Sequence, residues 1–321
     1  MDNENKNGGE ITKRTLWARI RRKIRHTYGK TVITSYRRIV AQPFFMNLKN
    51  RPAKKAYALQ KHELSDVQQK ILSDLERDGL AFVHLDELFP GENVFPTLQT
   101  FVEKEFINAS VGRNKKFLTF LWNNFPVFSL SNPIIKLALQ PKIVEVANAY
   151  TGLFSRFAFF SVNRTIVSHD ASAQGSQRWH RDPGMGDERM VKVFVYLNDV
   201  TDIGTGPFMF VKKTQRTGKW GKLFPAKQPD GVYPPDGAVE SSELKESITP
   251  CFGRAGTLVF CDTTGLHKGG YSTTKERVMA TLYYVSPGSL QKPNFSFPAE
   301  SVAEVASLPD LGQRTLGRTG N

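Results

Sequence analysis

Two histidines and one aspartate are the residues of this chain whose types and spacing could do chemistry. His180 and Asp182 are separated by a single residue, and His267 follows much later in the segment 265–270. Two imidazoles and one carboxylate can occupy one face of a ferrous ion and leave the opposite face for a co-substrate and oxygen. The three residues are therefore candidate ligands of a non-haem iron.

The spacing of His180 and Asp182 indicates how their side chains could converge. In an extended strand, residues i and i+2 point to the same side, so Arg181 would turn away from both. His267 must then arrive from a distant segment, and a closed or sandwiched β fold is the usual way to arrange that. A single His-x-Asp is a weak signal, because a lone histidine on a strand is more often structural than a ligand.

Segments with strand character follow residue 157, and turn residues separate most of them. They are 157–163, 164–168, 191–197, 207–211, 256–261 and 278–285. This succession is typical of an all-β sandwich or barrel. Residues 212–256 are rich in Pro, Gly and Lys, so we expect a long loop there, and its position makes it a candidate lid over the iron.

Helical patterns precede the strands. Ser65 is a candidate N-cap, and Gln68 three residues later completes a capping box. Gly79 suits the C-terminal stop of this helix, and residues 80–83 then have strand character. Further helices are expected at 134–139 and 143–150. Pro43 and Pro52 predict a linker before Ser65.

Basic residues are concentrated near the start of the chain. The net charge is +14, and residues 11–55 contain 14 Lys or Arg with no Asp or Glu. Residues 1–10 contribute −2, so the remaining 266 residues carry only +2. Because the rest of the chain is nearly neutral, nucleic-acid binding by the whole protein is disfavoured.

Residues 11–42 have the pattern of an amphipathic helix. Leu16, Ile20 and Ile24 recur at four-residue spacing, with Trp17 beside them. Three interpretations stay open: packing against the domain, contact with an anionic membrane surface, and contact with nucleic acid.

The two cysteines, Cys251 and Cys261, provide no disulfide framework and favour a reducing compartment. We expect Cys261, at the end of an apolar run, to be a buried structural thiol. No apolar run reaches the length of a transmembrane helix, and no secretory signal pattern is found at the N-terminus. The expected location is cytoplasmic, with peripheral attachment to a membrane as an open alternative. The sequence also lacks a Gly-rich phosphate loop, a Cys-x-x-Cys pair and a nucleophile elbow.

The chain resembles the phytanoyl-CoA dioxygenase family of Fe(II)/2-oxoglutarate-dependent oxygenases from about Gly79 to Pro287. The similar segments are 78–83, the surroundings of His180, 193–200, Gly206-Pro207, and His267 with Arg277. The resemblance implies a mainly β fold with flanking helices, built on a double-stranded β-helix (jelly-roll) core. It also implies that His180, Asp182 and His267 bind the iron. Related halogenases replace the aspartate by Gly or Ala, so Asp182 favours hydroxylation.

The resemblance also implies a site for the co-substrate. Arg277 matches the arginine that pairs with the distal carboxylate of 2-oxoglutarate, because a guanidinium presents a planar fork of donors. Thr281 lies four positions further on and would share a strand face with it. Asn163 and Gln177 are candidate partners of the C1 carboxylate. Met279 stands where some related oxygenases have a serine, which leaves a second anchor unassigned.

We therefore expect residues 1–55 to form a basic, partly helical arm, residues 56–297 an Fe(II)/2-oxoglutarate dioxygenase domain, and residues 298–321 a weakly ordered tail. The expected reaction uses O2 and 2-oxoglutarate to hydroxylate a small organic or lipid-like molecule. Two other functions stay open: a non-catalytic jelly roll that binds a metal or ligand, and a membrane-surface protein that acts through its basic arm.

Overall fold

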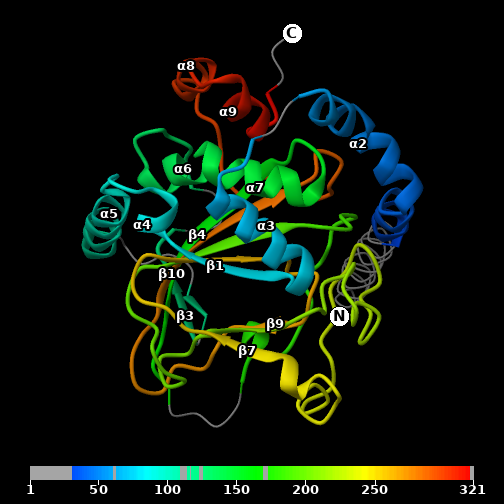
Figure 1. The fold of residues 1–321 in the computed structure, drawn as a ribbon, viewed down its shortest axis with the longest axis vertical. Helices are drawn as coiled ribbons and strands as arrows, with labels where there is room; N and C mark the ends of the chain where they lie inside the picture. The colour runs from blue at the N-terminus through cyan, green and yellow to red at the C-terminus, as the bar shows by residue number, and fades with distance from the viewer. Residues whose placement is uncertain are drawn as a thin grey trace, which may run out of the picture.

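The computed structural model describes residues 31–60, 63–108, 114–115, 117–122, 126–168 and 173–318. Strands form two sheets, and helices flank them (Figure 1). The strands are β1 (Leu80–His84), β2 (Asn114–Lys115), β3 (Leu118–Phe120), β4 (Arg156–Thr165), β5 (Val191–Tyr196), β6 (Phe208–Val211), β7 (Ile248–Cys251), β8 (Thr257–Cys261), β9 (His267–Lys268) and β10 (Val278–Val285). The helices are α2 (Pro43–Ala58), α3 (Asp66–Asp78), α4 (Leu85–Leu88), α5 (Val94–Asn108), α6 (Pro133–Ala138), α7 (Pro141–Thr151), α8 (Ser301–Ala306) and α9 (Asp310–Thr315).

The larger sheet has the strand order β1-β8-β5-β10-β4-β3-β2, and all its pairings are antiparallel. The smaller sheet has the order β7-β6-β9 and is also antiparallel. Figure 1 shows the small sheet on one side of the large sheet and α6 and α7 on the other. The expected mainly β, jelly-roll fold with flanking helices is confirmed.

The alternation of side chains along the strands produces two cores. On β5, Val193 and Val195 face the helices and pack with residues such as Ile143 of α7. Phe194 and Tyr196 face the small sheet, where they pack against Phe208 of β6. Because strand residues alternate between faces, the even-numbered positions of β5 line the interior between the sheets. Cys261 faces the same interior, and its burial agrees with the expectation of a structural thiol.

The helix after Ser65 forms as its capping residues predict. The Ser65 hydroxyl accepts a hydrogen bond from the Gln68 N–H, and the capping box is complete. Gly79 ends the helix with φ +74°, a conformation that L side chains rarely adopt. A Cβ at Gly79 would also lie 2.6 Å from Oε1 of Gln215, so both backbone and space require glycine here. The strand expected at 80–83 is β1.

The expected linker around Pro43 and Pro52 is wrong, because these residues belong to the helix α2. Pro43 stands in the first turn, where no backbone N–H is needed. Met46 and Asn50 bury one side of the helix against the domain, and this tertiary packing outweighs the helix-breaking tendency of the internal Pro52. Of the expected helix 11–42, residues 31–40 are helical, residues 41–42 form a turn before α2, and residues 11–30 lie outside the described residues.

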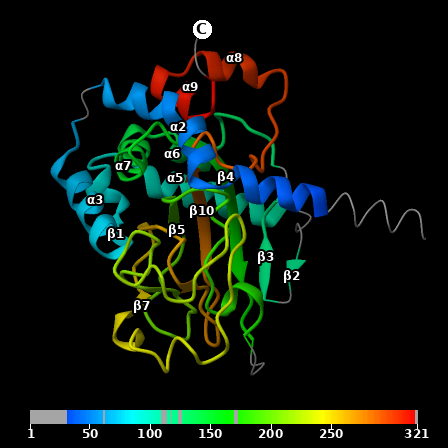
Figure 2. The same cartoon turned by 90° about the vertical axis from the view of Figure 1, so that its right-hand side faces the viewer.

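The expectation of a weakly ordered tail is also wrong for residues up to 318. The helices α8 and α9 form there, and Val305 and Leu316 join the core beneath them. α9 contacts α7 and β4, and Figure 2 shows both C-terminal helices over this side of the molecule. A few well-placed apolar residues are enough to hold short helices on an existing core.

Three strand expectations need correction. β4 runs unbroken from Arg156 to Thr165, although two strands meeting at residues 163–164 were expected. The stretch 212–256 is not all loop, because β7 lies within it. β7 escapes the pattern because it is short and contains Pro250, which an edge strand tolerates. His180 and Arg181 form isolated bridges and Asp182 forms none, so residues 180–182 are not a regular strand.

Candidate metal centre

His180 and His267 are brought together by the backbone. They form an antiparallel bridge in which each N–H donates to the carbonyl of the other residue at 2.9 Å. Residues that face each other in this way place their side chains on the same side of the pair. The two imidazole rings consequently lie with their centroids 4.2 Å apart.

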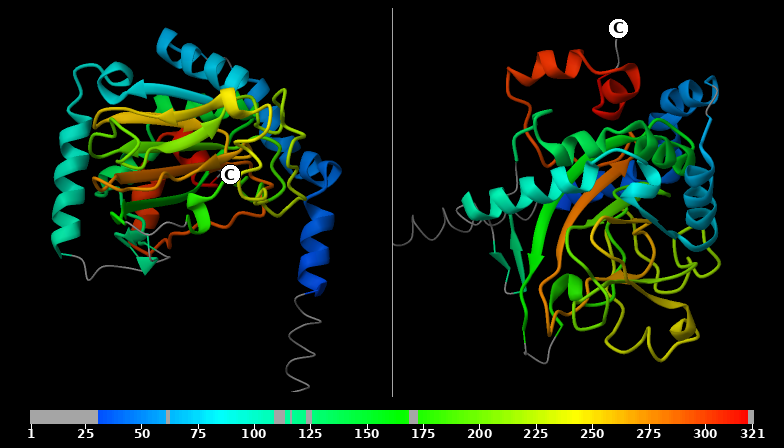
Figure 3. Two further views of the ribbon diagram at one scale, coloured as in Figure 1. Left: turned by 90° about the horizontal axis from the view of Figure 1, so that it is seen from below. Right: turned by 60° about the vertical axis from the view of Figure 1, so that its left-hand side comes forward.

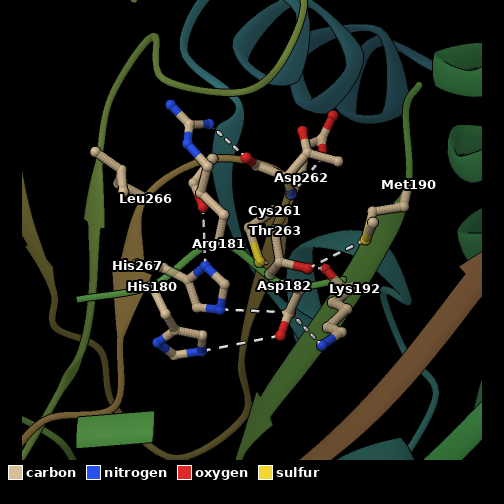
Figure 4. Close-up of polar contacts among 12 residues, drawn as sticks. His180, Arg181, Asp182, Met190, Lys192, Cys261, Asp262, Thr263, Leu266 and His267 are labelled. Atoms are coloured by element: carbon tan, nitrogen blue, oxygen red, sulfur yellow. Dashed lines mark hydrogen bonds and ion pairs between the residues drawn. The ribbon is translucent and has the colours of Figure 1, made fainter. Parts of the chain in front are cut away.

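Asp182 completes the cluster. Its Oδ1 lies 3.8 Å from Nε2 of His180, and its Oδ2 lies 3.4 Å from Nε2 of His267. One potential ligand atom from each of the three side chains falls within 4.8 Å of the others (Figure 4). The Asp182 N–H is held by the carbonyl of Thr263, so the aspartate is anchored to the segment that precedes His267.

The outer nitrogens of both imidazoles are fixed by main-chain carbonyls. Nδ1 of His180 donates to the carbonyl of Arg178 at 2.8 Å, and Nδ1 of His267 donates to that of Gly265 at 3.0 Å. A carbonyl can only accept, so Nδ1 carries the proton and the lone pair of each neutral ring is on Nε2. Both lone pairs are therefore available on the nitrogens nearest the carboxylate.

The electrostatics of the cluster favour the ligand forms of its residues. Burial, together with the neighbouring His267, lowers the pKa of His180 to about 4, so its ring is neutral at physiological pH. Burial alone would raise the pKa of Asp182, but Lys192 and the two histidines hold it well below its usual range. Two neutral nitrogen donors and one carboxylate fit an Fe(II) ion.

Lys192 is a site residue that was not predicted from the sequence. Its ammonium donates to Oδ2 of Asp182 at 2.5 Å and lies 4.9 Å from the centre of the Tyr283 ring. Lys192 occupies an interior-facing position of β5 and is the one charged residue of that strand. The sequence did contain a signal for Lys192. It is a single lysine in an otherwise apolar strand, and it stands two residues before a position that faces the interior.

Arg181 turns away from the cluster, as its position between His180 and Asp182 predicts (Figure 4). Its guanidinium is buried and donates to main-chain carbonyls only, those of Thr214, Trp220, Leu223, Phe224 and Thr264. Four of these carbonyls belong to the stretch 212–256. Arg181 thus holds this long segment by hydrogen bonds on the side of the backbone that faces away from the metal cluster.

The same stretch, residues 212–256, also contacts the side chain of a candidate ligand through Tyr233. The Tyr233 ring stacks on His180 with centroids 5.3 Å apart and an interplanar angle of 19°. The adjacent carbonyl of Val232 accepts from the Arg181 N–H at 2.9 Å. These contacts place part of residues 212–256 against the candidate iron ligands, and its role as a lid stays a prediction.

Arg277 is a buried cation without a carboxylate partner among the described residues. Its side chain is 3% exposed, it donates to the carbonyl of Gly206, and its Nε has no hydrogen-bond partner. A Cβ on Gly269 would lie 3.8 Å from its guanidinium, so Arg277 is close to the strand that carries His267. An unpaired guanidinium buried here is suited to an anionic ligand.

Three further predicted residues lie near this interior. Asn163 pairs across the sheet with Met279, on the inner face, and its buried Oδ1 has no partner. Thr281 is buried on β10, two residues past Met279, so it shares that face. Gln177 is buried just before His180, but its Oε1 accepts from the Gln174 N–H and closes a short 3-10 turn. The unpaired Oδ1 of Asn163 is an acceptor, so only the amide N–H groups of Asn163 or Gln177 could contact a carboxylate.

Comparisons with known proteins bear on the fold. The sequence matches no protein-family model and no curated protein. Similar solved structures do exist. The epimerase SnoN in complex with Fe3+, alpha-ketoglutarate and nogalamycin RO has a TM-score of 0.52 and 16% identity, over 71% of this chain and 87% of that one. EctD from S. alaskensis with bound Fe has a TM-score of 0.50 and 17% identity, over 74% and 83%.

At this level of identity, the similarity shows the fold and no more. A second SnoN structure, described as a non-haem alpha-ketoglutarate-dependent epimerase from nogalamycin biosynthesis, gives the same result with a TM-score of 0.53 and 15% identity, over 71% of this chain and 86% of that one. The chain thus has the jelly-roll fold found in non-haem iron enzymes, and a His-Asp-His cluster capable of holding a metal lies within it.

Proposed function

We propose that this chain is an Fe(II)- and 2-oxoglutarate-dependent dioxygenase that hydroxylates a small organic or lipid-like substrate. The observation that carries the proposal is the convergence of His180, Asp182 and His267, with both imidazoles tethered so that Nε2 is free. A jelly-roll fold and the unpaired guanidinium of Arg277 near the same strands support it.

The proposed division of labour follows from the positions of the side chains. His180, Asp182 and His267 hold the ferrous ion on one face. Once bound, that ion supplies the activation of O2 and the oxidation that accompanies decarboxylation of 2-oxoglutarate. Arg277 binds the distal carboxylate of 2-oxoglutarate, since a desolvated guanidinium gains most from a bidentate anion.

Residues of the inner face of the large sheet complete the co-substrate site. Asn163 can donate its amide N–H groups to the C1 carboxylate, and Thr281 can add a hydroxyl donor beside Arg277. Tyr233, stacked on His180 and half exposed, helps exclude water from the metal face. The resemblance to the phytanoyl-CoA dioxygenase family supports this arrangement through the spacing of His267 and Arg277, and it does not specify a substrate.

We also propose that the dioxygenase domain occupies residues 56–297, because the resemblance, from about Gly79 to Pro287, lies within them. Residues 1–55 would precede it as a basic arm whose helix α2 packs on the domain, and residues 298–321 would follow it as a tail whose helices α8 and α9 join the core. A cytoplasmic location is proposed because Cys251 and Cys261 are both free thiols. None of the described helices is long and apolar enough to cross a membrane.

The competing function is a jelly roll that binds a metal without turnover. The discriminating experiment incubates the purified chain with Fe(II), ascorbate, O2 and 2-oxoglutarate, and measures succinate with and without a library of small organic and lipid-like metabolites. We expect substrate-stimulated succinate release that His267→Ala abolishes. The matched control is His84→Ala, which removes a histidine outside the cluster. Metal binding without succinate under all conditions would favour the non-catalytic alternative.

A further inference from the structure

Helix α2 has two faces of opposite character. The inner face is anchored to the domain: Asn50 donates to Oγ of Ser286 at 2.9 Å and accepts from the Gly288 N–H at 2.7 Å. Phe44 and Leu48 are one helical turn apart and lie on the opposite side. Their exposed fractions are 72% and 59%, so two large apolar side chains of this well-anchored helix are left in solvent.

These apolar side chains are mixed with cations. A shallow groove on the outer side of α2 is lined by Phe44, Asn47, Leu48, Arg51, Lys54 and Lys55. The groove therefore combines an apolar floor with three positive charges and no acidic residue. An amphiphile with an anionic head matches this chemistry.

The preceding helix, residues 31–40, extends the same surface. Val32, Ile33, Tyr36 and Ile39 recur at the spacing of one helix face, and all four are exposed. Figure 3 shows this helix projecting from the body of the molecule, next to α2. An apolar stripe at helical spacing normally faces a core, and none of the described residues buries this one.

A cavity of about 830 Å³ lies on the inner side of α2. It is lined by Asn50 of the helix and by Asp187 and Arg189, which stand between Asp182 and Lys192 in sequence. Asn47 and Lys54 line both this cavity and the outer groove, and the Lys54 ammonium donates to Oδ1 of Asn47 at 3.0 Å. The cavity and the amphipathic outer surface are thus separated only by the edge of one helix.

We propose that residues 31–40 and the outer face of α2 seat the protein on an anionic lipid bilayer. The apolar side chains enter the interface between headgroups and acyl chains, and the cations contact the phosphates. Residues 11–55, with 14 basic and no acidic side chains, supply the complementary charge. The docking does not depend on the proposed reaction, but it would bring the cavity beside α2 to the lipid surface.

The combination of charged and apolar side chains favours a lipid surface over a nucleic acid or a second copy of the chain as the partner of this surface. A nucleic acid would be met by the cations alone, and Phe44, Leu48 and Ile39 would gain nothing from phosphate contacts. A second copy of the chain would bring the same cations into opposition, because an isologous interface pairs a surface with itself. Only a bilayer with anionic headgroups satisfies both components of the surface.

The test is a vesicle flotation assay with the full chain. Vesicles of phosphatidylcholine are compared with vesicles of equimolar phosphatidylcholine and phosphatidylglycerol. We expect at least about tenfold tighter binding to the anionic vesicles, since each cation near the surface contributes a few-fold. The variant Phe44→Ser with Leu48→Ser should lose about tenfold or more of that affinity, because two buried apolar side chains are removed from the interface.

The matched control is Ile203→Ser with Val302→Ser, which removes two apolar side chains that are 58% and 60% exposed elsewhere on the molecule. This control should bind vesicles as the unaltered chain does, and thermal unfolding of both variants should match that of the unaltered chain. Absence of binding to anionic vesicles, or equal binding by the two double variants, overturns the proposal. The proposal is also overturned if vesicles do not bind and the chain instead forms a dimer, or a complex with RNA, that is lost in Phe44→Ser with Leu48→Ser.

Discussion

Lys192 donates a hydrogen bond to Asp182 from the neighbouring strand β5, with 2.5 Å between Nζ and Oδ2. The carboxylate is thereby kept ionised and oriented, with Oδ1 directed to the side of His180. The lysine is itself held by its strand and by the face of the Tyr283 ring. This contact links the candidate metal cluster to the rigid large sheet.

We predict that Lys192→Met weakens binding of Co(II), used as a stable substitute for Fe(II), by about tenfold or more, because partners behind a metal ligand typically contribute that much. Lys192→Arg should restore part of the loss, since it keeps a donor near Oδ2. Isothermal titration calorimetry measures both. Unchanged or tighter binding in Lys192→Met would mean that repulsion between the ammonium and the metal outweighs the orientation of Asp182.

Removal of the buried guanidinium should act on the co-substrate. Arg277→Ala is predicted to raise the 2-oxoglutarate concentration needed for half-maximal succinate formation by about 30-fold or more, as truncation of one partner of a buried ion pair costs roughly 2–5 kcal/mol. In the same variant, 2-oxoglutarate should no longer raise the melting temperature of the metal-loaded protein. The exposed Arg254 provides the matched control, Arg254→Ala. An unaltered 2-oxoglutarate requirement would remove Arg277 from the site.

Arg181 should be one of the most important residues for stability. Arg181→Ala removes every side-chain donor from the buried carbonyls of Thr214 and Thr264 and from the partly buried carbonyls of residues 220–224, and Arg181→Lys removes most of them. Each change should lower the free energy of unfolding by at least about 3 kcal/mol. Urea unfolding monitored by tryptophan fluorescence provides the measurement. Three positions earlier, Arg178 forms an exposed ion pair with Asp236, and Arg178→Ala should cost less than about 1 kcal/mol. Equal losses for Arg178 and Arg181 variants would contradict the proposed fastening of the segment.

Asp187 should make stability depend on pH. Burial raises the pKa of Asp187 from 3.8 to about 7, although Ser286 and Ser289 offset part of the effect. Below pH 4 the carboxyl is protonated in both the folded and the unfolded chain. As the pH rises from about 4 to 7 the unfolded chain loses this proton first, so stability falls over that range and the full cost is present above about pH 8.

Asp187→Asn removes this cost. The variant should be more stable than the unaltered chain at pH 8, by on the order of 2–4 kcal/mol, and should match it near pH 4. Glu188→Gln, at an exposed neighbouring position, should have little effect at either pH. Denaturant unfolding at the two pH values decides the matter. A stability difference of Asp187→Asn that does not change with pH would show that the pKa of Asp187 is the same in the folded and the unfolded chain.

Local patterns were sufficient where a few neighbouring residues determine the structure. Ser65 and Gln68 predict a capped helix, and Gly79 predicts its end, because capping hydrogen bonds and the left-handed conformation involve only adjacent residues. The strands β5, β8 and β10 follow from apolar runs with turns between them. The His-x-Asp spacing likewise predicts that Arg181 turns away from His180 and Asp182.

Tertiary contacts decided the rest. The backbone bridge between His180 and His267 joins segments far apart in the chain, and no local pattern specifies that pairing. The helix α2 forms across Pro52 because Asn50 and Met46 gain partners in the domain. Lys192 becomes a site residue only because β5 turns its even-numbered positions inward.

The sequence by itself determined which side chains could bind a metal, because residue types and their spacing along the chain are local properties. The tertiary structure alone decided that these side chains meet and that Arg277 is buried without a carboxylate partner among the described residues. It also decided that Phe44 and Leu48 remain exposed. Distances between segments and burial depend on how the whole chain packs, and that packing is the sum of many weak contacts that no short segment contains.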